Sequence, residues 1–309
     1  MKRAVFAGAV LAAALVSSAG AQTAMPTVRV AMPPIDAASQ VYYAQAKGFF
    51  KKVGLTVEIM PISEGASVVA AVAGGSADIG QANLSSLAAA FVRGLPFVAI
   101  AGANTFNAKT HQSELVVAVN SPIRGAKDLN GKTVAVSGLK NVQEVGFDKW
   151  MDSNGGNWTS VHMVEVPFSA TAEAVASGRV DAAMMAEPQL GAALAAKRVK
   201  ILAAPFESIG KEFVLGTWFT TQAYAKAHPD VVKAYAQAMV MAAEWANKNQ
   251  EESGKILGAA TGIPVAPNAS RLLFATSLDQ KGMQALIDAS AKYGALKNSF
   301  PVSELVAAP

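Results

Sequence analysis

The chain contains the same eight-residue pattern twice. The pattern is A-V-A-x-G-x-x-D, and it occupies residues 71–78 and residues 174–181. The segments before the two copies also correspond, since residues 56–61 read T-V-E-I-M-P and residues 163–167 read M-V-E-V-P. Internal similarity of this kind indicates a structural unit that is built more than once. We therefore expect two similar α/β lobes in one chain, with a cleft between them.

Strand and helix patterns alternate along most of the chain, from residue 27 to about residue 216. Such alternation predicts a mainly parallel sheet flanked by helices in each lobe. Residues 114–120 and 213–221 are rich in β-forming residues, and we expect these two strands to cross between the lobes. The pattern is helical from residue 229 onward. The predicted limits are 22–116 plus 217–309 for the first lobe and 117–216 for the second.

Residues 1–21 are predicted to be a secretory signal peptide. Lys2 and Arg3 precede an apolar run, and Ala19, Gly20 and Ala21 supply the small residues of a cleavage site. The apolar run is shorter than the roughly 20 residues that span a bilayer. The sequence has no cysteine, so it offers neither a lipid-anchoring thiol nor a disulfide. We expect a protein without a lipid anchor in an exported compartment, most simply the periplasm.

The charge of the chain argues against a nucleic-acid partner. Without Lys2 and Arg3, 24 basic residues stand against 22 acidic ones. Basic residues are adjacent only as pairs, at residues 51–52 and 197–198. A nucleic-acid-binding protein needs a concentrated basic face.

The sequence also lacks the motifs of common enzymes. It contains no G-x-S-x-G, H-E-x-x-H, P-loop or G-x-G-x-x-G motif. His111, His162 and His228 have no metal-ligand spacing, and thiolate metal sites need cysteine. We therefore predict a binding protein without catalytic residues, metal or cofactor.

The candidate ligand-binding residues lie where predicted strands lead into helices, and in the return crossing. In parallel α/β sheets, ligands bind beyond the carboxyl ends of the strands, where helix N-termini favour polar or anionic groups. The candidates are Gln40, Tyr42, Gly65, Ala66, Asn83, Leu84, Ser85, Ser137, Gly138, Leu139, Lys140, Asn141, Glu187 and Trp218.

Several candidates have an ordinary structural interpretation beside the functional one. Asn83, Ser85 and Asn141 are also natural helix caps. Glu187 is either an acceptor for a ligand donor group or an acidic residue that begins a helix. Trp218 is either a wall of the cleft or a core residue, and an exposed position for Lys140 is as consistent with its residue type as a place beside the ligand.

Four segments of the chain resemble periplasmic solute-binding proteins of ABC importers. Residues 47–58, K-G-F-F-K-K-V-G-L-T-V-E, are similar to a characteristic segment of these proteins. Residues 75–80, 120–132 and 178–182 continue the match in the same order. The chain thus resembles the nitrate, sulfonate, taurine and thiamine-pyrimidine binding group.

This resemblance implies a monomeric, two-lobed type II periplasmic-binding-protein fold that closes around its ligand. It also implies delivery of the solute to a membrane permease driven by an ATPase. The turns at residues 65–66, 83–85, 137–141 and 187–188 match ligand-contacting regions of the group. Leu139 and Glu187 stand where a small inorganic anion would need other residues, so the resemblance favours an organic ligand. The pyrimidine-synthase branch needs a cysteine-rich motif that this chain lacks.

We therefore predict capture of a small organic anion, a sulfonate or a carboxylate. Helix N-termini would hold the anionic end, Glu187 would select a donor group, and an apolar wall would be formed by Tyr42, Leu84, Leu139 and Trp218. A neutral nitrogen heterocycle is the alternative ligand. A solute-sensing module and, less favoured, an exported enzyme are the alternative functions.

Overall fold

The computed structural model describes residue 1 and residues 25–110, 113–266 and 271–306. Apart from Met1, the predicted signal peptide lies outside the described residues. Among the residues that the structure describes, no helix combines the length and the apolar character that a membrane crossing requires.

The first sheet has six strands in the order β11-β4-β10-β3-β1-β2. Strand β1 pairs in parallel with β2 and β3, and β10 lies antiparallel between β3 and β4. The strands are β1 (Thr27–Met32), β2 (Thr56–Pro61), β3 (Ile79–Asn83), β4 (Phe97–Asn107), β10 (Glu212–Thr221) and β11 (Leu273–Phe274).

The second sheet has five strands in the order β7-β6-β8-β5-β9. Strand β6 pairs in parallel with β7 and β8, and β5 lies antiparallel between β8 and β9. Both sheets are thus mixed, but most strands of each sheet run in the same direction, as predicted. The strands are β5 (Ser113–Ala118), β6 (Thr133–Val136), β7 (His162–Glu165), β8 (Ala182–Ala186) and β9 (Val199–Ala203).

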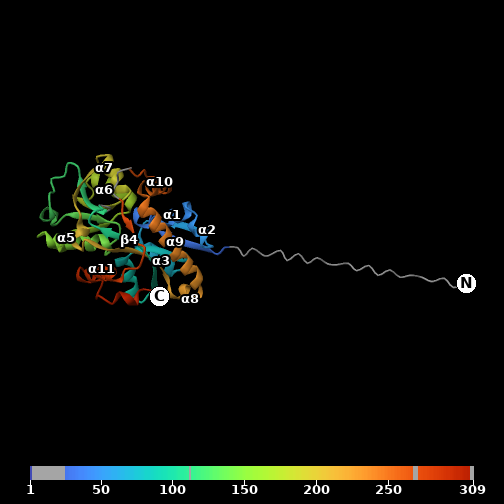
Figure 1. Ribbon diagram of the computed structural model, residues 1–309. Helices are drawn as coiled ribbons and strands as arrows, with labels where there is room; N and C mark the ends of the chain where they lie inside the picture. Colours follow the sequence, from blue (N-terminus) through green and yellow to red (C-terminus); the bar gives the residue numbers. More distant parts are fainter. Residues whose placement is uncertain (2–24, 111–112, 267–270, 307–309) are drawn as a thin grey trace.

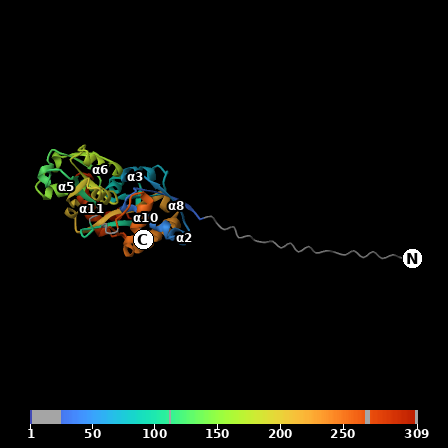
Figure 2. The same cartoon turned by 90° about the horizontal axis from the view of Figure 1, so that it is seen from above.

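Helices accompany both sheets (Figures 1 and 2). We call each sheet with its helices a lobe. The first lobe contains α1 (Gln40–Ala46), α2 (Phe49–Lys52), α3 (Gly65–Ala73), α4 (Leu84–Val92), α8 (Gln222–Ala227), α9 (Pro229–Lys248), α10 (Gln250–Thr261) and α11 (Gln280–Lys292). The second lobe contains α5 (Val142–Ser153), α6 (Phe168–Ala176) and α7 (Gln189–Ala195). The short 3-10 helices are η1 (Asp36–Ala38), η2 (Ala126–Leu129), η3 (Trp158–Ser160), η4 (Pro205–Ser208) and η5 (Val302–Glu304).

The chain changes sheet at places that differ from the predicted crossing strands. Strand β5 pairs only within the second sheet, and β10 pairs only within the first. The changes of sheet therefore lie between Asn107 and Ser113 and between Ala203 and Glu212. An apolar run looks the same in a strand inside one sheet as in a strand that crosses between lobes. This explains why the strands at residues 114–120 and 213–221 were predicted to cross. The lobe limits at residues 116 and 216 stay a prediction.

The sequence repeat builds the same connection in both lobes. The Asp78 carboxylate accepts a hydrogen bond from the backbone N–H of Arg29 at 2.8 Å, and the Asp181 carboxylate accepts one from Thr133 at 2.9 Å. The backbone N–H of each aspartate donates to the carbonyl of the same partner residue. Each aspartate therefore ties the turn after a helix to the start of a strand in the sheet.

The glycines of the repeat occupy the turn itself. Gly75 and Gly178 have φ angles of 72° and 73°. This left-handed region favours glycine because a side chain would be strained there. The repeat is therefore explained by folding, and it lies at the edge of each sheet opposite the carboxyl ends of its parallel strands.

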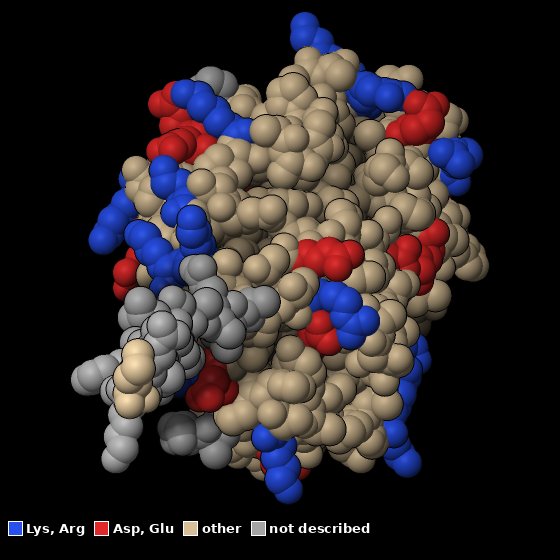
Figure 3. Space-filling view, turned by 90° about the vertical axis from the view of Figure 1, so that its right-hand side faces the viewer, with Lys and Arg blue, Asp and Glu red and all other residues tan. Residues whose placement is uncertain are grey.

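The hydrophobic core continues from one lobe into the other. One buried cluster contains Phe97 of the first sheet together with Val134 and Val145 of the second lobe. Where the chain changes sheet, the rings of Phe106, Phe206 and Phe213 contact one another at centroid distances of 5.1–6.3 Å. The surface is different in character: on the face drawn in Figure 3, basic and acidic side chains are interspersed around a largely uncharged area.

Candidate functional site

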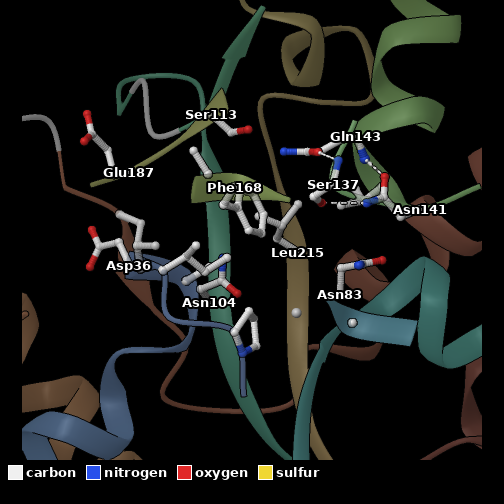
Figure 4. A pocket seen from close by; sticks show the side chains of 18 of the residues that line it. Asp36, Asn83, Asn104, Ser113, Ser137, Asn141, Gln143, Phe168, Glu187 and Leu215 are labelled. Carbon is white, nitrogen blue, oxygen red and sulfur yellow. Dashed lines mark hydrogen bonds between the residues drawn. The ribbon is translucent and has the colours of Figure 1, made fainter. Parts of the chain in front are cut away.

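A pocket lies between the two lobes, at the carboxyl ends of parallel strands. It contains about 650 Å³ of empty space, part of it open to solvent, and residues of both lobes line it. Figure 4 shows side chains from both lobes around this space. The first lobe contributes Pro33, Ile35, Asp36, Ala37, Gly65, Gln81, Asn83, Asn104, Leu215, Gly216 and Leu272, and the second Ser113, Ser137, Asn141, Val142, Gln143, Phe168, Ala186 and Glu187, while Phe206 lies at the return connection.

Four helices begin at this pocket. Asn83 caps α4 by accepting a hydrogen bond from Ser86 N–H at 2.9 Å, and Asn141 caps α5 by accepting from Gln143 N–H at 2.8 Å. Gly65 and Phe168 are the first residues of α3 and α6, and neither of these two helices has a side-chain cap. Because the first N–H groups of a helix have no partner within it, α3 and α6 present donors toward the pocket.

A hydrogen-bond network holds one wall of the pocket. The backbone N–H of Ser137 donates to Gln143 Oε1 at 2.7 Å, and Asn141 Nδ2 donates to Ser137 Oγ at 3.0 Å (Figure 4). These residues connect the end of β6 to the first turn of α5. The network fixes the orientation of three polar side chains before a ligand arrives.

Two other polar residues of the pocket lack hydrogen-bond partners among the described residues. Asn104 is 1% exposed, and neither its amide nitrogen nor its amide oxygen has a partner. Ser113 is 6% exposed, and its hydroxyl also has no hydrogen-bond partner among the described residues. Buried polar groups of folded proteins nearly always form hydrogen bonds. These side chains are therefore candidates for direct ligand contact.

Asp36 is already occupied by a buried ion pair. Arg271 donates to its carboxylate through Nε at 2.7 Å and through Nη2 at 2.6 Å. Arg271 Nη2 also donates to the Tyr43 hydroxyl at 2.6 Å. Burial raises the pKa of Tyr43, and the nearby Asp36 carboxylate raises it further. The ion pair balances its own charge and leaves the pocket with little net charge on this side.

Glu187 is the other acidic group of the lining, and it connects the lobes. Its backbone carbonyl accepts a hydrogen bond from Asp36 N–H at 3.0 Å, and its Oε2 accepts one from Gly191 N–H at 3.0 Å. A Cβ on Gly191 would lie 2.9 Å from that oxygen, so the glycine leaves space for the carboxyl group. Burial raises the pKa of Glu187 to about 7. Near neutral pH, Glu187 can therefore either donate or accept a hydrogen bond.

The lining contains no lysine or arginine among the residues that the structure describes. Those same residues also include no group of three or more side chains that could hold a metal ion. Polar contacts in the pocket would come from amides, hydroxyls, helix N–H groups and Glu187.

Five of the predicted binding residues line this pocket, namely Gly65, Asn83, Ser137, Asn141 and Glu187. The other nine do not, and they are Gln40, Tyr42, Ala66, Leu84, Ser85, Gly138, Leu139, Lys140 and Trp218. For all fourteen residues, contact with a ligand stays a prediction.

Most of the nine residues have other partners. Trp218 Nε1 donates to Gln40 Oε1 at 2.6 Å, and both side chains are completely buried. Ser85 shares a 2.8 Å hydrogen bond with Ser290. Three apolar candidates are spread over different environments, because Leu84 is a core residue, Tyr42 packs beside a core cluster and Leu139 is 52% exposed.

The remaining three candidates are neighbours in the chain of residues that line the pocket, but they do not line it themselves. Ala66 and Lys140 are exposed, and Gly138 is partly exposed. Lys140 has a φ angle of 55° in the turn before α5. Its charge therefore lies in solvent.

Sequence reasoning missed several polar residues of the pocket. Gln81 lies two residues before Asn83 on β3, and strand periodicity places both side chains on the same face. Gln143 lies two residues after the predicted Asn141. Asn104 follows a run of seven apolar or glycine residues on β4, and an amide that ends such a run is a usable signal. Asp36 and Phe168 lie in turns 35–40 and 168–171, which follow predicted strands and are candidate binding turns, although neither residue was singled out. Ser113 had no comparable signal.

The comparisons with known proteins agree with this architecture. The family model described as NMT1/THI5 like matches residues 37–253. The taurine-binding periplasmic protein of Escherichia coli (strain K12) is 30% identical over 203 residues, which are 64% of this chain. The chain spans 60% of the length of that curated relative.

Solved structures share the fold. The alkanesulfonate-binding protein SsuA from Xanthomonas axonopodis pv. citri, bound to MOPS, has a TM-score of 0.74 at 19% identity and covers 91% of this chain and 98% of its own. The periplasmic nitrate-binding protein NrtA from Synechocystis PCC 6803 has a TM-score of 0.73 at 14% identity, with coverages of 88% and 83%. These similarities confirm the predicted two-lobed periplasmic-binding-protein fold.

Proposed function

Because the chain belongs to the NMT1/THI5-like family and has a polar pocket between its lobes, we propose that it captures a small organic solute for an ABC importer. The observation that carries the proposal is the buried, unpartnered amide of Asn104 inside that pocket. The family membership confirms the resemblance that residues 47–58 and the later segments indicate. A permease and an ATPase would be the partners, and the predicted signal peptide supports a periplasmic location.

Two features support a ligand that has an acceptor-rich end, such as a sulfonate or carboxylate. The uncapped N-termini of α3 and α6 both begin at the pocket, one from each lobe. Helix N-termini attract anions through their free N–H groups and the helix dipole. An organic anion held there would contact both lobes and would favour the closed arrangement.

A neutral nitrogen heterocycle is supported by a different observation. The described lining contains several amides and no lysine or arginine, and Glu187 adds an acidic group. Such a lining matches the donors and acceptors of a heterocycle without requiring a charged ligand. Phe168 and Leu215 supply apolar surface for a flat ring.

A ligand screen with a pocket-filling variant tests the capture proposal. The panel contains alkyl and aryl sulfonates, aromatic carboxylates, nitrate and nitrogen heterocycles, and the measurement is calorimetric titration after a thermal-shift screen. A ligand at about 100 times its Kd stabilises the folded protein by about 2.7 kcal/mol, which is a shift of a few degrees. Val142→Trp fills the pocket from the first turn of α5 and should abolish binding.

Leu139→Trp is the matched control, because it adds the same ring three residues earlier at an exposed position outside the lining. Binding that survives in Val142→Trp as well as in Leu139→Trp would show that the solute binds elsewhere. Uptake of the identified solute by cells with and without the gene then separates import from solute sensing.

A further inference from the structure

Helix α5 of the second lobe makes three different contacts along its length. Its first residue, Val142, lines the pocket. In its middle, Gly146 lies against the return connection, where a Cβ on the glycine would be 2.6 Å from Phe206 Cδ1. Near its end, Asp152 Oδ2 accepts a hydrogen bond at 2.9 Å from the hydroxyl of Tyr293, the residue that follows α11 of the first lobe. At about 1.5 Å per residue, the pocket and the Tyr293 contact lie on opposite sides of Gly146, about 6 Å and about 9 Å from it along the helix.

Both connections between the lobes leave the first sheet beside the middle of α5. The ring of Phe206 contacts the rings of Phe106 and Phe213 at centroid distances of 5.7 and 6.3 Å. Phe106 lies at the end of β4 and Phe213 at the start of β10, where the chain leaves and re-enters the first sheet. Lobes joined by two short connections move by bending at those connections. A rotation of the second lobe about this point moves the two ends of α5 in opposite directions.

Tyr293 is packed tightly between the two lobes. It is 6% exposed, and its ring meets the ring of Trp158 edge-on at a centroid distance of 6.0 Å. Helix α11 itself packs on α4 and β10 of the first lobe and lies beside α5 (Figures 1 and 2). The 2.9 Å hydrogen bond to Asp152 already has the normal length for a hydroxyl donor. The far end of α5 therefore cannot move closer to α11 unless the Tyr293 ring is displaced.

We propose that Tyr293 limits how far the two lobes open, and that it is thereby a positioning residue for ligand binding. When the second lobe tilts away from the first at the pocket, the far end of α5 moves toward Tyr293, whose ring already fills the space. The ligand-free protein is thus kept near the arrangement in which both lobes reach a ligand. This inference rests on the proposed function and adds to it a controlling residue outside the pocket lining.

The expected effect on affinity follows from the populations of the two arrangements. A solute held by both lobes binds the closed arrangement, so its apparent Kd is the intrinsic Kd divided by the closed fraction. Tyr293→Ala removes the ring, allows wider opening and lowers that fraction. We expect the Kd for a solute to rise about three- to tenfold, although Tyr293 does not touch the solute.

Lobe opening is measured in the ligand-free protein, so this readout does not depend on the identity of the solute. The sequence has no cysteine, and Ser67→Cys with Ser169→Cys therefore gives two unique sites for spin labels. Both serines are exposed, and they lie in the first turns of α3 and α6, the uncapped helices that begin at the pocket from opposite lobes. Double electron–electron resonance should show longer distances in Tyr293→Ala than in the otherwise wild-type labelled protein.

Three further variants separate this role from a loss of stability. Tyr293→Phe keeps the ring and loses only the hydroxyl, so its distances should stay close to those of the wild type. Trp158→Ala gives the Tyr293 ring room to move aside, and it should lengthen the distances even if Tyr293→Ala does not fold. Tyr224→Ala is the matched control, because it removes the same side chain from the first lobe at a place where the ring contacts His228. It should leave both the distances and the Kd unchanged.

The inference is overturned if Tyr293→Ala and Trp158→Ala both keep the wild-type distances. Benzenesulfonate, titrated by calorimetry, separates this failure from failure of the proposed function. If benzenesulfonate binds wild type and Tyr293→Ala equally but does not bind Val142→Trp, solute capture stands and the role of Tyr293 falls. Longer distances in Tyr293→Ala, together with no binding of any solute of the panel to the wild type, would support the limit on opening and count against solute capture.

Discussion

At the scale of single residues, the pocket depends on polar groups whose ordinary chemistry is changed by burial. Glu187 shows this most directly, because it is 7% exposed and its carboxyl group accepts a hydrogen bond from the Gly191 N–H. Burial disfavours the charged carboxylate and raises its pKa to about 7, and the nearby Asp36 adds to the effect. Arg271 and the Gly191 N–H act in the opposite direction without cancelling the rise.

This raised pKa predicts a pH-dependent stability. The folded protein holds the Glu187 proton more tightly than the unfolded chain, so the stability from this group is complete below about pH 4.5 and is lost as the pH rises through about 7. The loss should be on the order of 2–3 kcal/mol. Glu187→Gln cannot ionise and still offers an oxygen to Gly191. Its Tm should therefore fall less than that of the wild type between about pH 5 and 8.

Glu251→Gln serves as the control for Glu187→Gln. Glu251 is exposed, and its hydrogen bond with Lys255 lowers its pKa. Its replacement should leave the pH profile of the wild type in place. Parallel profiles for wild type and Glu187→Gln would contradict the prediction.

At the scale of elements, both copies of the repeated motif join helix, turn and strand through the same backbone hydrogen bonds. The aspartates of the two copies differ in the side chains that contact them. Asp78 receives Arg29 Nη2 at 2.6 Å and Nε at 3.1 Å in addition to the backbone N–H. Asp181 receives the Thr133 N–H, and Lys132 Nζ lies 3.9 Å from Asp181 Oδ1. Burial alone would raise the pKa of Asp78, but the hydrogen bonds and charge of Arg29 hold it below the usual value.

The two copies should therefore differ in their contribution to stability. We expect Asp78→Asn to cost about 1–2 kcal/mol and Asp181→Asn about 0.5–1 kcal/mol, because only the first loses a charge-assisted pair of hydrogen bonds. Urea denaturation of both variants measures the difference. An equal cost, or a larger cost for Asp181→Asn, would show that the guanidinium contributes nothing beyond the backbone contact.

At the scale of the whole molecule, the arrangement of the lobes depends on contacts between them. Asp36 N–H donates to the Glu187 carbonyl, and the Tyr293 hydroxyl donates to Asp152 Oδ2 at 2.9 Å. A third contact joins two acids, Glu64 before α3 and Glu165 at the end of β7. Burial raises the pKa of Glu64 to about 7, and a hydrogen bond to Glu165 and the charge of Glu165 raise it further. While Glu64 is protonated, it can donate a hydrogen bond to Glu165.

We therefore expect the contact between the lobes at Glu64 and Glu165 to weaken as the pH rises. The contribution of Glu64 is complete below about pH 4.5 and is lost through about pH 7, where two facing carboxylates repel each other. Glu64→Gln keeps a hydrogen bond to Glu165 without the second charge. The Kd of the identified ligand should rise with pH in the wild type and remain nearly constant in Glu64→Gln.

Small-angle scattering at the same pH values reports the lobe arrangement directly. Glu58→Gln is the control, since Glu58 is exposed on β2. If the Kd of Glu64→Gln follows the wild-type pH profile, the protonation of Glu64 does not influence ligand binding.

The sequence by itself determined the architecture and part of the site. The alternation of strand and helix patterns and the repeat predicted two α/β lobes with mainly parallel sheets, because these signals are local and are set by backbone geometry. The same local signals located Gly65, Asn83, Ser137, Asn141 and Glu187 at strand ends that line the pocket. Residues that follow predicted strands can be found without knowledge of the packing.

Only the tertiary structure decided which side chains face the pocket. Trp218 and Leu215 lie three residues apart on β10, yet Trp218 is in the core with Gln40, and Leu215 lines the pocket. Asn104, Gln81 and Gly216 come together because three strands of distant sequence pair in one sheet. The physical reason is that sheet order and the approach of the lobes are set by packing between segments far apart in the chain, which local patterns do not encode.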